Sequence, residues 1–166
     1  MENIENDRSL VMSEIMTPEK VNFSGKIHGG YILMYIDQVA YACAARYSGK
    51  NIVTLSVDRV VFKKPICVGE LVTFNAMVNY VGSTSMEIGV KIISENLKTR
   101  EKRHTNSCFL TMVAVDENMK PTKVKTFEPK TEVEQHRWNQ ALERREINKK
   151  FLQEHQQRKE TLRKKG

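Results

Sequence analysis

No stretch of the sequence is long and apolar enough to cross a membrane as a helix. Such a span needs about 18 apolar residues in a row, and no run in the 166-residue chain reaches that length. The opening residues, MENIENDRSL, are acidic and polar, unlike a signal or transit peptide. We therefore expect a cytoplasmic protein without a membrane partner.

Cysteine is also scarce. The three cysteines, Cys43, Cys67 and Cys108, are widely spaced and lie in apolar surroundings. An odd number without a CxxC pair or a Cys/His cluster excludes a disulfide framework and gives no zinc signature, so we predict no metal site. We expect Cys43 to be a small buried apolar residue, and a nucleophilic thiol is the alternative.

Acidic residues are outnumbered by basic ones. Lys and Arg total 27 against 20 Asp and Glu, which gives a net charge of +7. This excess indicates either an anionic partner or a solvated basic segment, and composition does not choose between them. The apolar and charged contents are those of an ordinary globular protein, and the length favours one domain.

The composition changes near residue 120. Apolar runs alternate with turn signals before it, whereas VDENMKPTKVKTFEPK and the residues that follow are rich in charge. We assign 8–122 to a folded domain and 123–166 to a connector and a basic C-terminal helical tail. Strong helix formers predict one helix over 131–166. Because glutamates mix with its basic residues, we expect a solvated helix at a subunit edge and no nucleic-acid partner.

One long helix is predicted after the glycine pair at 29–30. Apolar residues follow the rhythm of a single helical face at Ile32, Leu33, Ile36, Val39, Ala40, Cys43 and Ala44. Gly49, in RYSGK, is the natural end of this helix.

Strand patterns occur on both sides of the helix in the sequence. We expect a short strand in 9–16, alternating strands in 51–62, 70–81 and 86–92, and a central strand in the apolar run 107–115. The apolar phase slips around Asp58 and Arg59, which predicts a β-bulge there. Gly82 predicts a hairpin between 70–81 and 86–92. Strands that follow a helix in a run favour an α+β fold, with a curved antiparallel sheet wrapped on the helix.

Two polar residues near the start of the helix are candidates for chemistry. Asp37 falls about 20° beyond Ala44, at the edge of the apolar arc. It is either a flank carboxylate, solvated or paired with Arg46 or a lysine, or a half-buried base that faces a cleft. Asn22 either caps a turn or orients a water molecule or a carbonyl group.

The helix opens with His28, Gly29 and Gly30. The glycines either form a tight entry turn or let a substrate oxygen approach the unpaired N–H groups of the first turn, as in an oxyanion hole. We expect His28 to be a polar helix-start residue, and acid-base catalysis is the alternative.

Two further sets of residues are candidates for phosphate binding. Ser83, Thr84 and Ser85 lie in the polar hairpin turn, and Lys63 and Lys64 lie in a turn-rich connector. Each set either contacts a phosphate or forms an ordinary solvated turn.

Taken together, four stretches resemble the acyl-CoA thioesterase branch of the hotdog-fold superfamily, in particular the bacterial YciA type and the mammalian brain-type cytosolic acyl-CoA hydrolases. They are NFSGKIHGGYILMYIDQVA, NIVTLSVDRVVFKKPICVGE, VNYVGSTSMEI and SCFLTMVAVDENMKP, which occur in the family's order and spacing over roughly residues 8–122.

The resemblance implies a hotdog fold, in which a curved antiparallel sheet wraps a long central helix. It implies an acyl-CoA thioester hydrolase without a separate cofactor, because coenzyme A is part of the substrate. The working unit would be a homodimer, and three dimers would form a hexamer. Asp37 of one subunit and Asn22 of the other would be the catalytic pair, and His28, Gly29 and Gly30 would position the thioester.

The resemblance also gives the positive charge a partner, since coenzyme A carries several phosphate charges. Its implied contacts are Lys63, Lys64, Ser83, Thr84, Ser85 and Lys102 or Arg103. Lys26 stands where relatives often have Asn or Asp, which implies an altered substrate preference.

Two other functions stay open. One is a non-catalytic acyl-CoA-binding hotdog module, which would normally add a helix-turn-helix unit that this sequence does not show. The other is a hotdog hydratase or dehydratase, which uses His with Asp or Glu in motifs that His28 and Asp37 do not form.

Overall fold

The computed structural model describes residues 8–163, with the side chains of the last two of these left out. The chain divides into two compact units. The first ends at Phe127 and the second begins at Glu128.

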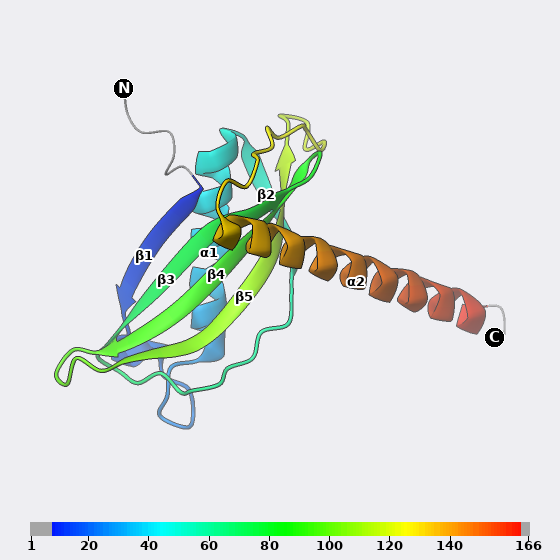
Figure 1. Cartoon of the computed structure of the whole chain (residues 1–166). Coiled ribbons are helices and arrows are strands. Elements are labelled where there is room, and N and C mark those ends of the chain that lie inside the picture. The colour runs from blue at the N-terminus through cyan, green and yellow to red at the C-terminus, as the bar shows by residue number, and fades with distance from the viewer. Residues whose placement is uncertain (1–7, 164–166) are drawn as a thin grey trace. The chain divides into compact units, whose positions relative to one another are not determined.

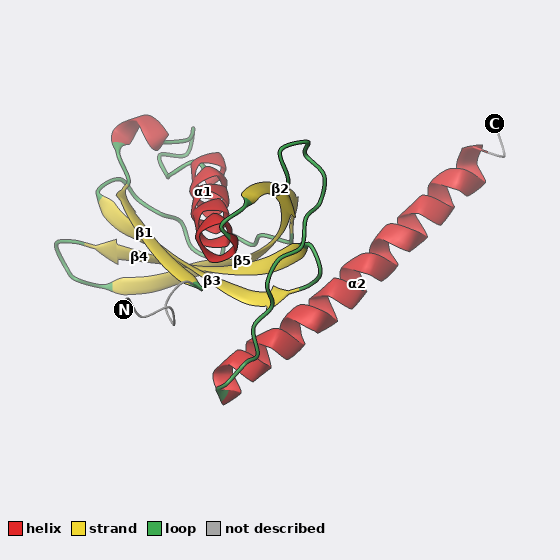
Figure 2. Cartoon of the chain, turned by 90° about the horizontal axis from the view of Figure 1, so that it is seen from above, coloured by secondary structure: helices red, strands yellow, loops and turns green. Residues whose placement is uncertain are grey.

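The first unit is one curved antiparallel sheet with a long helix in its concave face (Figures 1 and 2). Its elements are β1 (Ser9–Ile15), a 3-10 turn (Pro18–Lys20), α1 (Gly29–Ser48), β2 (Asn51–Val57), β3 (Glu70–Val81), β4 (Ser85–Asn96) and β5 (Lys102–Val115). The strand order is β1-β3-β4-β5-β2, so β1 and β2 are the edges. The predicted α+β hotdog architecture is confirmed.

The core lies between α1 and the concave face of the sheet. The buried face of α1 consists of Ile32, Ile36, Val39, Ala40, Cys43 and Ala44, as predicted. Leu33 is the exception, at 38% exposed. It lies near the edge of the apolar arc and at the start of the second turn of the helix, where burial depends on how far the sheet extends. Gly49 ends the helix with a φ of 62°, and its N–H bonds to the Ala45 carbonyl.

The predicted hairpin is formed by β3 and β4. The next strand is longer than the sequence indicates, because β5 begins at Lys102 and not at 107. Lys102 pairs with Glu95, and Arg103 pairs with Ser94, so both residues lie in a strand. Ladder hydrogen bonds need no apolar side chain, which is why hydrophobic alternation missed these residues.

The strand predicted over 51–62 ends at Val57, and its bulge lies between Thr54 and Ser56, not at Asp58 and Arg59. The Asp58 N–H still donates to the Phe109 carbonyl, at 2.9 Å. The chain then leaves β5. A few residues later, the Ile66 carbonyl accepts from the Ile27 N–H at 2.9 Å, so this segment is bound to the residues before α1 and not to the sheet.

The first unit includes residues 123–127, which the sequence pattern assigned to the connector. Val124 and Phe127 pack against the core. The Tyr47 hydroxyl donates to the Lys125 carbonyl at 2.6 Å, and the Val124 N–H donates to the Ser83 carbonyl at 3.0 Å. Two apolar side chains and these bonds hold the segment to the core despite its high charge.

The second unit contains α2 (Glu132–Arg163). It begins with a capping box, in which the Glu134 N–H donates to Thr131 Oγ1 and the Thr131 N–H donates to Glu134 Oε2. Two of its apolar residues are largely solvated, with Phe151 67% and Leu152 64% exposed.

The three cysteines differ in environment. Cys43 and Cys108 are buried in the core, and burial raises the pKa of each thiol to about 11. Cys67 lies between β2 and β3 and is partly exposed, with its Sγ 3.4 Å from Lys26 Nζ, so its surroundings are more polar than predicted.

Alkylation distinguishes these environments. We expect iodoacetamide at about pH 8 to modify Cys67 in the native protein and to modify Cys43 and Cys108 only after denaturation, because the thiolate is the reacting form. Peptide mass spectrometry measures this directly, with Cys67→Ser as the control. Equal modification of all three cysteines in the native protein would contradict this placement of the core.

Candidate functional site

Asn22 lies in a tight turn before α1. The Asn22 N–H donates to the Lys26 carbonyl at 2.7 Å, and Gly25 has a φ of 74°. Asn22 Oδ1 accepts from the Ser24 N–H at 2.9 Å, from Ser24 Oγ at 2.7 Å and from the Lys26 N–H at 3.2 Å. The turn therefore fixes the amide by its oxygen. Asn22 takes the turn-capping role, and its NH₂ group has no recorded acceptor in the described residues.

The N–H groups at the start of α1 are nearly all paired. The His28 N–H donates to the Lys20 carbonyl at 2.8 Å, and the Tyr31 N–H donates to the His28 carbonyl at 3.0 Å. The Gly30 N–H donates to His28 Nδ1 at 2.9 Å, so His28 is the N-cap, as expected for a helix-start residue. Of the two glycine donors predicted for a substrate oxygen, Gly30 is thus engaged by its own chain. The Gly29 N–H has no recorded acceptor in the described part of the chain.

Both positions also leave no room for a side chain. A Cβ on Gly29 would lie 3.3 Å from the Phe62 ring, and a Cβ on Gly30 would lie 3.0 Å from His28 Nδ1. The glycines therefore permit close packing at the helix start as well as access to the backbone.

Asp37 lies two turns into α1 and is partly exposed. Its Oδ1 accepts from Thr54 Oγ1 of β2 at 2.7 Å. Thr54 Oγ1 also lies 3.4 Å from Met112 Sδ. No ion pair with Arg46 or a lysine is recorded for Asp37 in residues 8–163, so the carboxylate is held by a neutral hydroxyl.

Thr54 was not identified from the sequence. It lies in the predicted strand after the helix, between the alternating residues Val53 and Leu55. The available signal was a hydroxyl residue at an alternating position of that strand. Its contact with Asp37 could not be predicted, because it depends on how α1 lies against β2.

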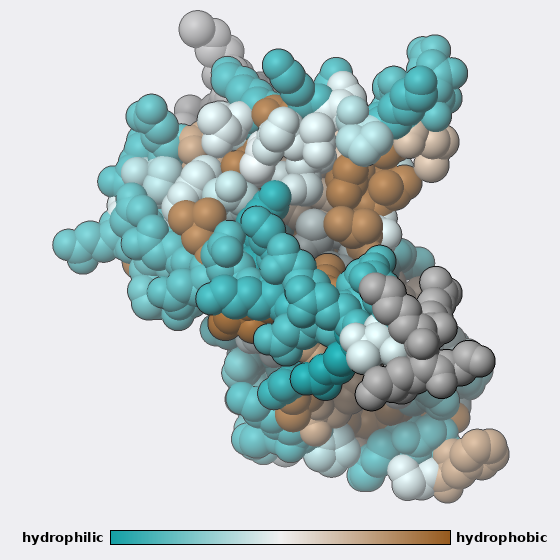
Figure 3. All heavy atoms as spheres, turned by 90° about the vertical axis from the view of Figure 1, so that its right-hand side faces the viewer, coloured by the Kyte–Doolittle hydropathy of each residue, from teal (hydrophilic) through white to brown (hydrophobic). Residues whose placement is uncertain are grey.

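Exposed apolar side chains occur on α1 on either side of Asp37 and on β2, the strand that carries Thr54. Leu33 and Tyr41, one turn before and one turn after it on α1, are 38% and 47% exposed. On β2, Leu55 is 69% and Val57 is 46% exposed. We call these four residues with Asp37 the Asp37 face. Figure 3 shows apolar groups at the surface on one side of the molecule. Exposed apolar side chains beside an unpaired edge strand indicate a surface that another chain covers.

Asp37 and Gly29 are well separated along α1. Eight residues of α-helix separate their backbone positions, which is about 12 Å along the axis. A hydrogen bond reaches about 3 Å. Within one chain, the two backbone positions are therefore separated by several times that reach.

The predicted phosphate contacts do not form one cluster. Ser83, Thr84 and Ser85 lie at the turn where β4 begins, and Lys102 and Arg103 pair with residues near its other end. The intervening strand of 12 residues spans about 36 Å. Lys63 and Lys64 are exposed between β2 and β3.

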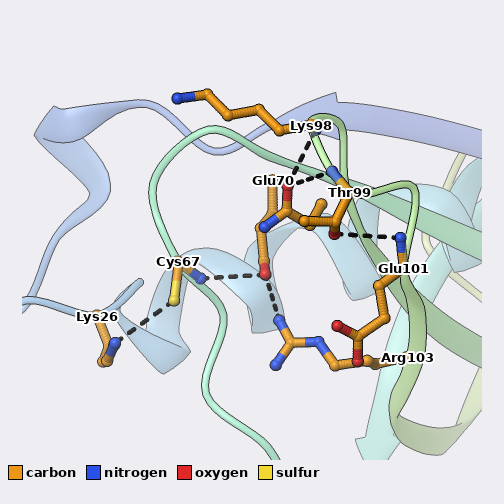
Figure 4. Close-up of polar contacts among 8 residues, drawn as sticks. Lys26, Cys67, Glu70, Lys98, Thr99, Glu101 and Arg103 are labelled. Carbon is orange, nitrogen blue, oxygen red and sulfur yellow. Dashed lines mark hydrogen bonds and ion pairs between the residues drawn. The ribbon is translucent and has the colours of Figure 1, made fainter.

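Arg103 is an ion-pair partner in this structure and not a free cation. Its guanidinium contacts Glu70, whose side chain is 7% exposed, and the other Glu70 oxygen accepts from the Cys67 N–H at 3.2 Å (Figure 4). Lys102 lies 3.5 Å from Glu95. The resemblance implied a phosphate contact for Lys102 or Arg103. The fold places carboxylates next to them, and the Glu70 bonds bind the segment before β3 to β5.

Within residues 8–163, no helix is long and apolar enough to cross a membrane. In the same residues, no three His, Cys, Asp or Glu side chains are grouped so as to hold a metal ion.

Comparison with known proteins gives consistent matches. Residues 24–101 match the profile of the Thioesterase superfamily. The chain is 56% identical to Protein VdlD of Helicobacter pylori over 138 residues, which are 83% of this chain and 79% of VdlD. It is 38% identical to YkhA of Bacillus subtilis, described as an uncharacterized acyl-CoA thioester hydrolase, over 83% of this chain and 80% of YkhA.

Solved structures agree with this. An apo-hexameric acyl-CoA thioesterase is 38% identical and has a TM-score of 0.85, covering 90% of this chain and 95% of its own. An acyl-CoA hydrolase from Staphylococcus aureus, in complex with butyryl coenzyme A, coenzyme A and coenzyme A disulfide, is 31% identical with a TM-score of 0.83, covering 93% and 94%.

The Staphylococcus aureus enzyme has also been solved as alanine mutants of an asparagine, an aspartate and a threonine at its positions 28, 43 and 60. These positions are 15 and 17 residues apart, the same separations as between Asn22, Asp37 and Thr54. The shared fold, the superfamily profile and relatives matched over about four fifths of their length lead to one conclusion: the chain belongs to the hotdog-fold acyl-CoA thioesterase family.

Proposed function

We propose that this chain hydrolyses acyl-CoA thioesters, consuming one water and releasing a carboxylic acid and CoA-SH. The observation that carries the proposal is the Asp37–Thr54 hydrogen bond on an exposed apolar face. With Asn22, these residues have the spacing of those replaced by alanine in the Staphylococcus aureus acyl-CoA hydrolase.

The active unit in this proposal is a homodimer that buries the Asp37 face. Leu55 and Val57 lie on the edge strand β2, which has unpaired backbone groups along its outer side. Pairing of two β2 strands would continue the sheet and cover both faces. The related apo-hexameric thioesterase supports a further assembly of three dimers.

Each of the two sites would take Asp37 from one chain and the Asn22 turn and helix start from the other. The 12 Å estimated between Asp37 and Gly29 within a chain supports this arrangement. A two-fold axis then generates two equivalent sites.

The roles follow from the hydrogen-bond capacity of each group. The free Gly29 N–H, at the positive end of α1, would stabilise the charge that develops on the thioester oxygen. The Asn22 NH₂ group would hold the carbonyl or the attacking water. Asp37 would either take a proton from that water or attack the carbonyl carbon to form an anhydride, which water then cleaves. Thiolate leaves readily, so no strong acid is required.

Lys63 and Lys64 are the proposed contacts for the phosphates of coenzyme A. They are exposed and belong to the loop that packs on the start of α1. Arg103 and Lys102 are less suited, because Glu70 and Glu95 already neutralise them.

A thiol-release assay tests the function. Purified protein and a series of acyl-CoA substrates should yield free CoA-SH together with the acid. Binding without release of thiol would indicate a sensor module, and a changed acyl chain on intact CoA would indicate a hydratase. Either result would reject the proposal.

Asp37→Asn should lower kcat by about 10²–10⁴-fold, the usual contribution of a positioned general base. The amide still accepts a hydrogen bond from Thr54, so the melting temperature should stay near that of the wild type. Asp116→Asn, which removes a carboxylate from the turn after β5, is the control and should keep full activity. A near-normal kcat for Asp37→Asn would exclude Asp37 as base or nucleophile.

Thr54→Val removes the hydroxyl that orients Asp37 and keeps a branched side chain. We expect kcat to fall about tenfold or more, since a hydrogen bond to a charged group contributes about 1.5–3 kcal/mol. Thr54→Ser retains the hydroxyl and should stay close to the wild type in steady-state kinetics. If Val and Ser at this position are equally active, the hydrogen bond has no role in turnover.

Mixing two inactive variants tests whether the site is shared. Asn22→Ala and Asp37→Ala should each have little activity. If Asp37 and Asn22 come from different chains, a mixed dimer has one intact site, and random exchange should restore about a quarter of the wild-type rate. The measurement is thiol release after the subunits are dissociated and reassembled together. No recovery from dimers proven to be mixed would place both residues of a site in one chain.

A further inference from the structure

Phe62 lies against the helix start but takes no part in the roles described above. Its Cζ and Cε2 atoms are 3.3 and 3.4 Å from the position of a Cβ on Gly29, so the ring packs on the glycine backbone. Even so, 49% of Phe62 is exposed. The ring thus has one surface on the helix start and another open to a ligand.

The segment that carries Phe62 is anchored on its C-terminal side. The Ile66 carbonyl accepts from the Ile27 N–H at 2.9 Å, and Lys26 Nζ lies 3.4 Å from Cys67 Sγ. The Cys67 N–H donates to the buried Glu70 carboxylate (Figure 4). These contacts hold the residues that follow Phe62 to the residues before α1 and to the start of β3, so the segment next to Gly29 is held by bonds other than the packing of the ring.

The Gly29 N–H is the donor left without an acceptor at the start of α1. A thioester carbonyl that accepts from it has its two substituents, the acyl carbon and the sulfur, within a few ångströms of the ring. The Phe62 ring offers no hydrogen bond to the amides of the pantetheine arm. It does offer apolar surface to the first carbons of an acyl chain.

We propose that Phe62 contacts the acyl group next to the thioester carbonyl and so contributes to substrate selection. The inference rests on the proposed function, since it requires an acyl-CoA whose carbonyl binds Gly29. It places the acyl chain on the Phe62 side of the helix start and makes Phe62 a specificity-determining residue.

Phe62→Ala tests this with acetyl-, butyryl- and hexanoyl-CoA in the thiol-release assay. For butyryl- and hexanoyl-CoA, kcat/KM should fall about tenfold, the effect of losing roughly half of an aromatic burial. Acetyl-CoA has only a methyl group to place on the ring and should lose less. The inhibition constant of free CoA, which has no acyl group, should stay within about twofold of the wild type, well under the tenfold that 1.4 kcal/mol would give.

Two further variants serve as controls for Phe62→Ala. Val61→Ala removes the neighbouring side chain, which is 50% exposed, and should change neither kcat/KM nor CoA inhibition. Phe62→Leu keeps apolar bulk and should recover most of the activity that Phe62→Ala loses. If Phe62→Ala does not fold, Phe62→Gln replaces it, because the amide keeps the length of the side chain without its apolar surface. Gel filtration should give the wild-type elution volume for each variant.

Three results would overturn the inference. They are unchanged kcat/KM in Phe62→Ala, a rise in the CoA inhibition constant that equals the loss of kcat/KM, and dissociation of the assembly. If the wild-type protein releases no CoA-SH from any acyl-CoA, the proposed function fails instead. Active wild type with an unaffected Phe62→Ala would reject only the role of Phe62.

Discussion

The structure depends on the burial of one face of α1 in the concave side of a five-stranded sheet. A single helix buries only one arc of its surface against a sheet. The orientation of the helix about its own axis therefore fixes both the residues at the centre of the arc and those at its edges. With Ile36, Val39 and Cys43 in the core, Asp37 lies on the flank next to β2. The position of the carboxylate is therefore a consequence of core packing.

The start of α1 pairs most of its first N–H groups within the chain. The His28 imidazole accepts from the Gly30 N–H, and the His28 carbonyl accepts from the Tyr31 N–H. The His28 N–H itself donates to the Lys20 carbonyl. Within residues 8–163, the Gly29 N–H has no recorded acceptor, and the turn before α1 fixes the Asn22 amide by its oxygen. In the proposed function, these two groups form one half of a site that Asp37 of a second chain completes.

Arg103 is one of the phosphate contacts that the resemblance implied, and a role toward coenzyme A stays a prediction. In the structure, Arg103 forms an ion pair with the buried carboxylate of Glu70. The same carboxylate accepts from the Cys67 N–H and so positions the segment before β3. A buried carboxylate needs such partners, and leaving either charge alone would cost more than the pair contributes.

Sequence determined the elements with long and regular patterns, namely α1 with its Gly49 end, the β3–β4 hairpin and the order of helix and strands along the chain. It also supplied Asn22, Asp37 and the glycines as candidates, through local spacing and resemblance. The end of β2 at Val57, the hydroxyl of Thr54 next to Asp37, the ion pair of Glu70 and the contact of Phe62 with Gly29 were decided only by the tertiary structure. Each of these joins segments distant in sequence, and a periodic pattern records which face of an element is buried but not which residue of another element it meets there.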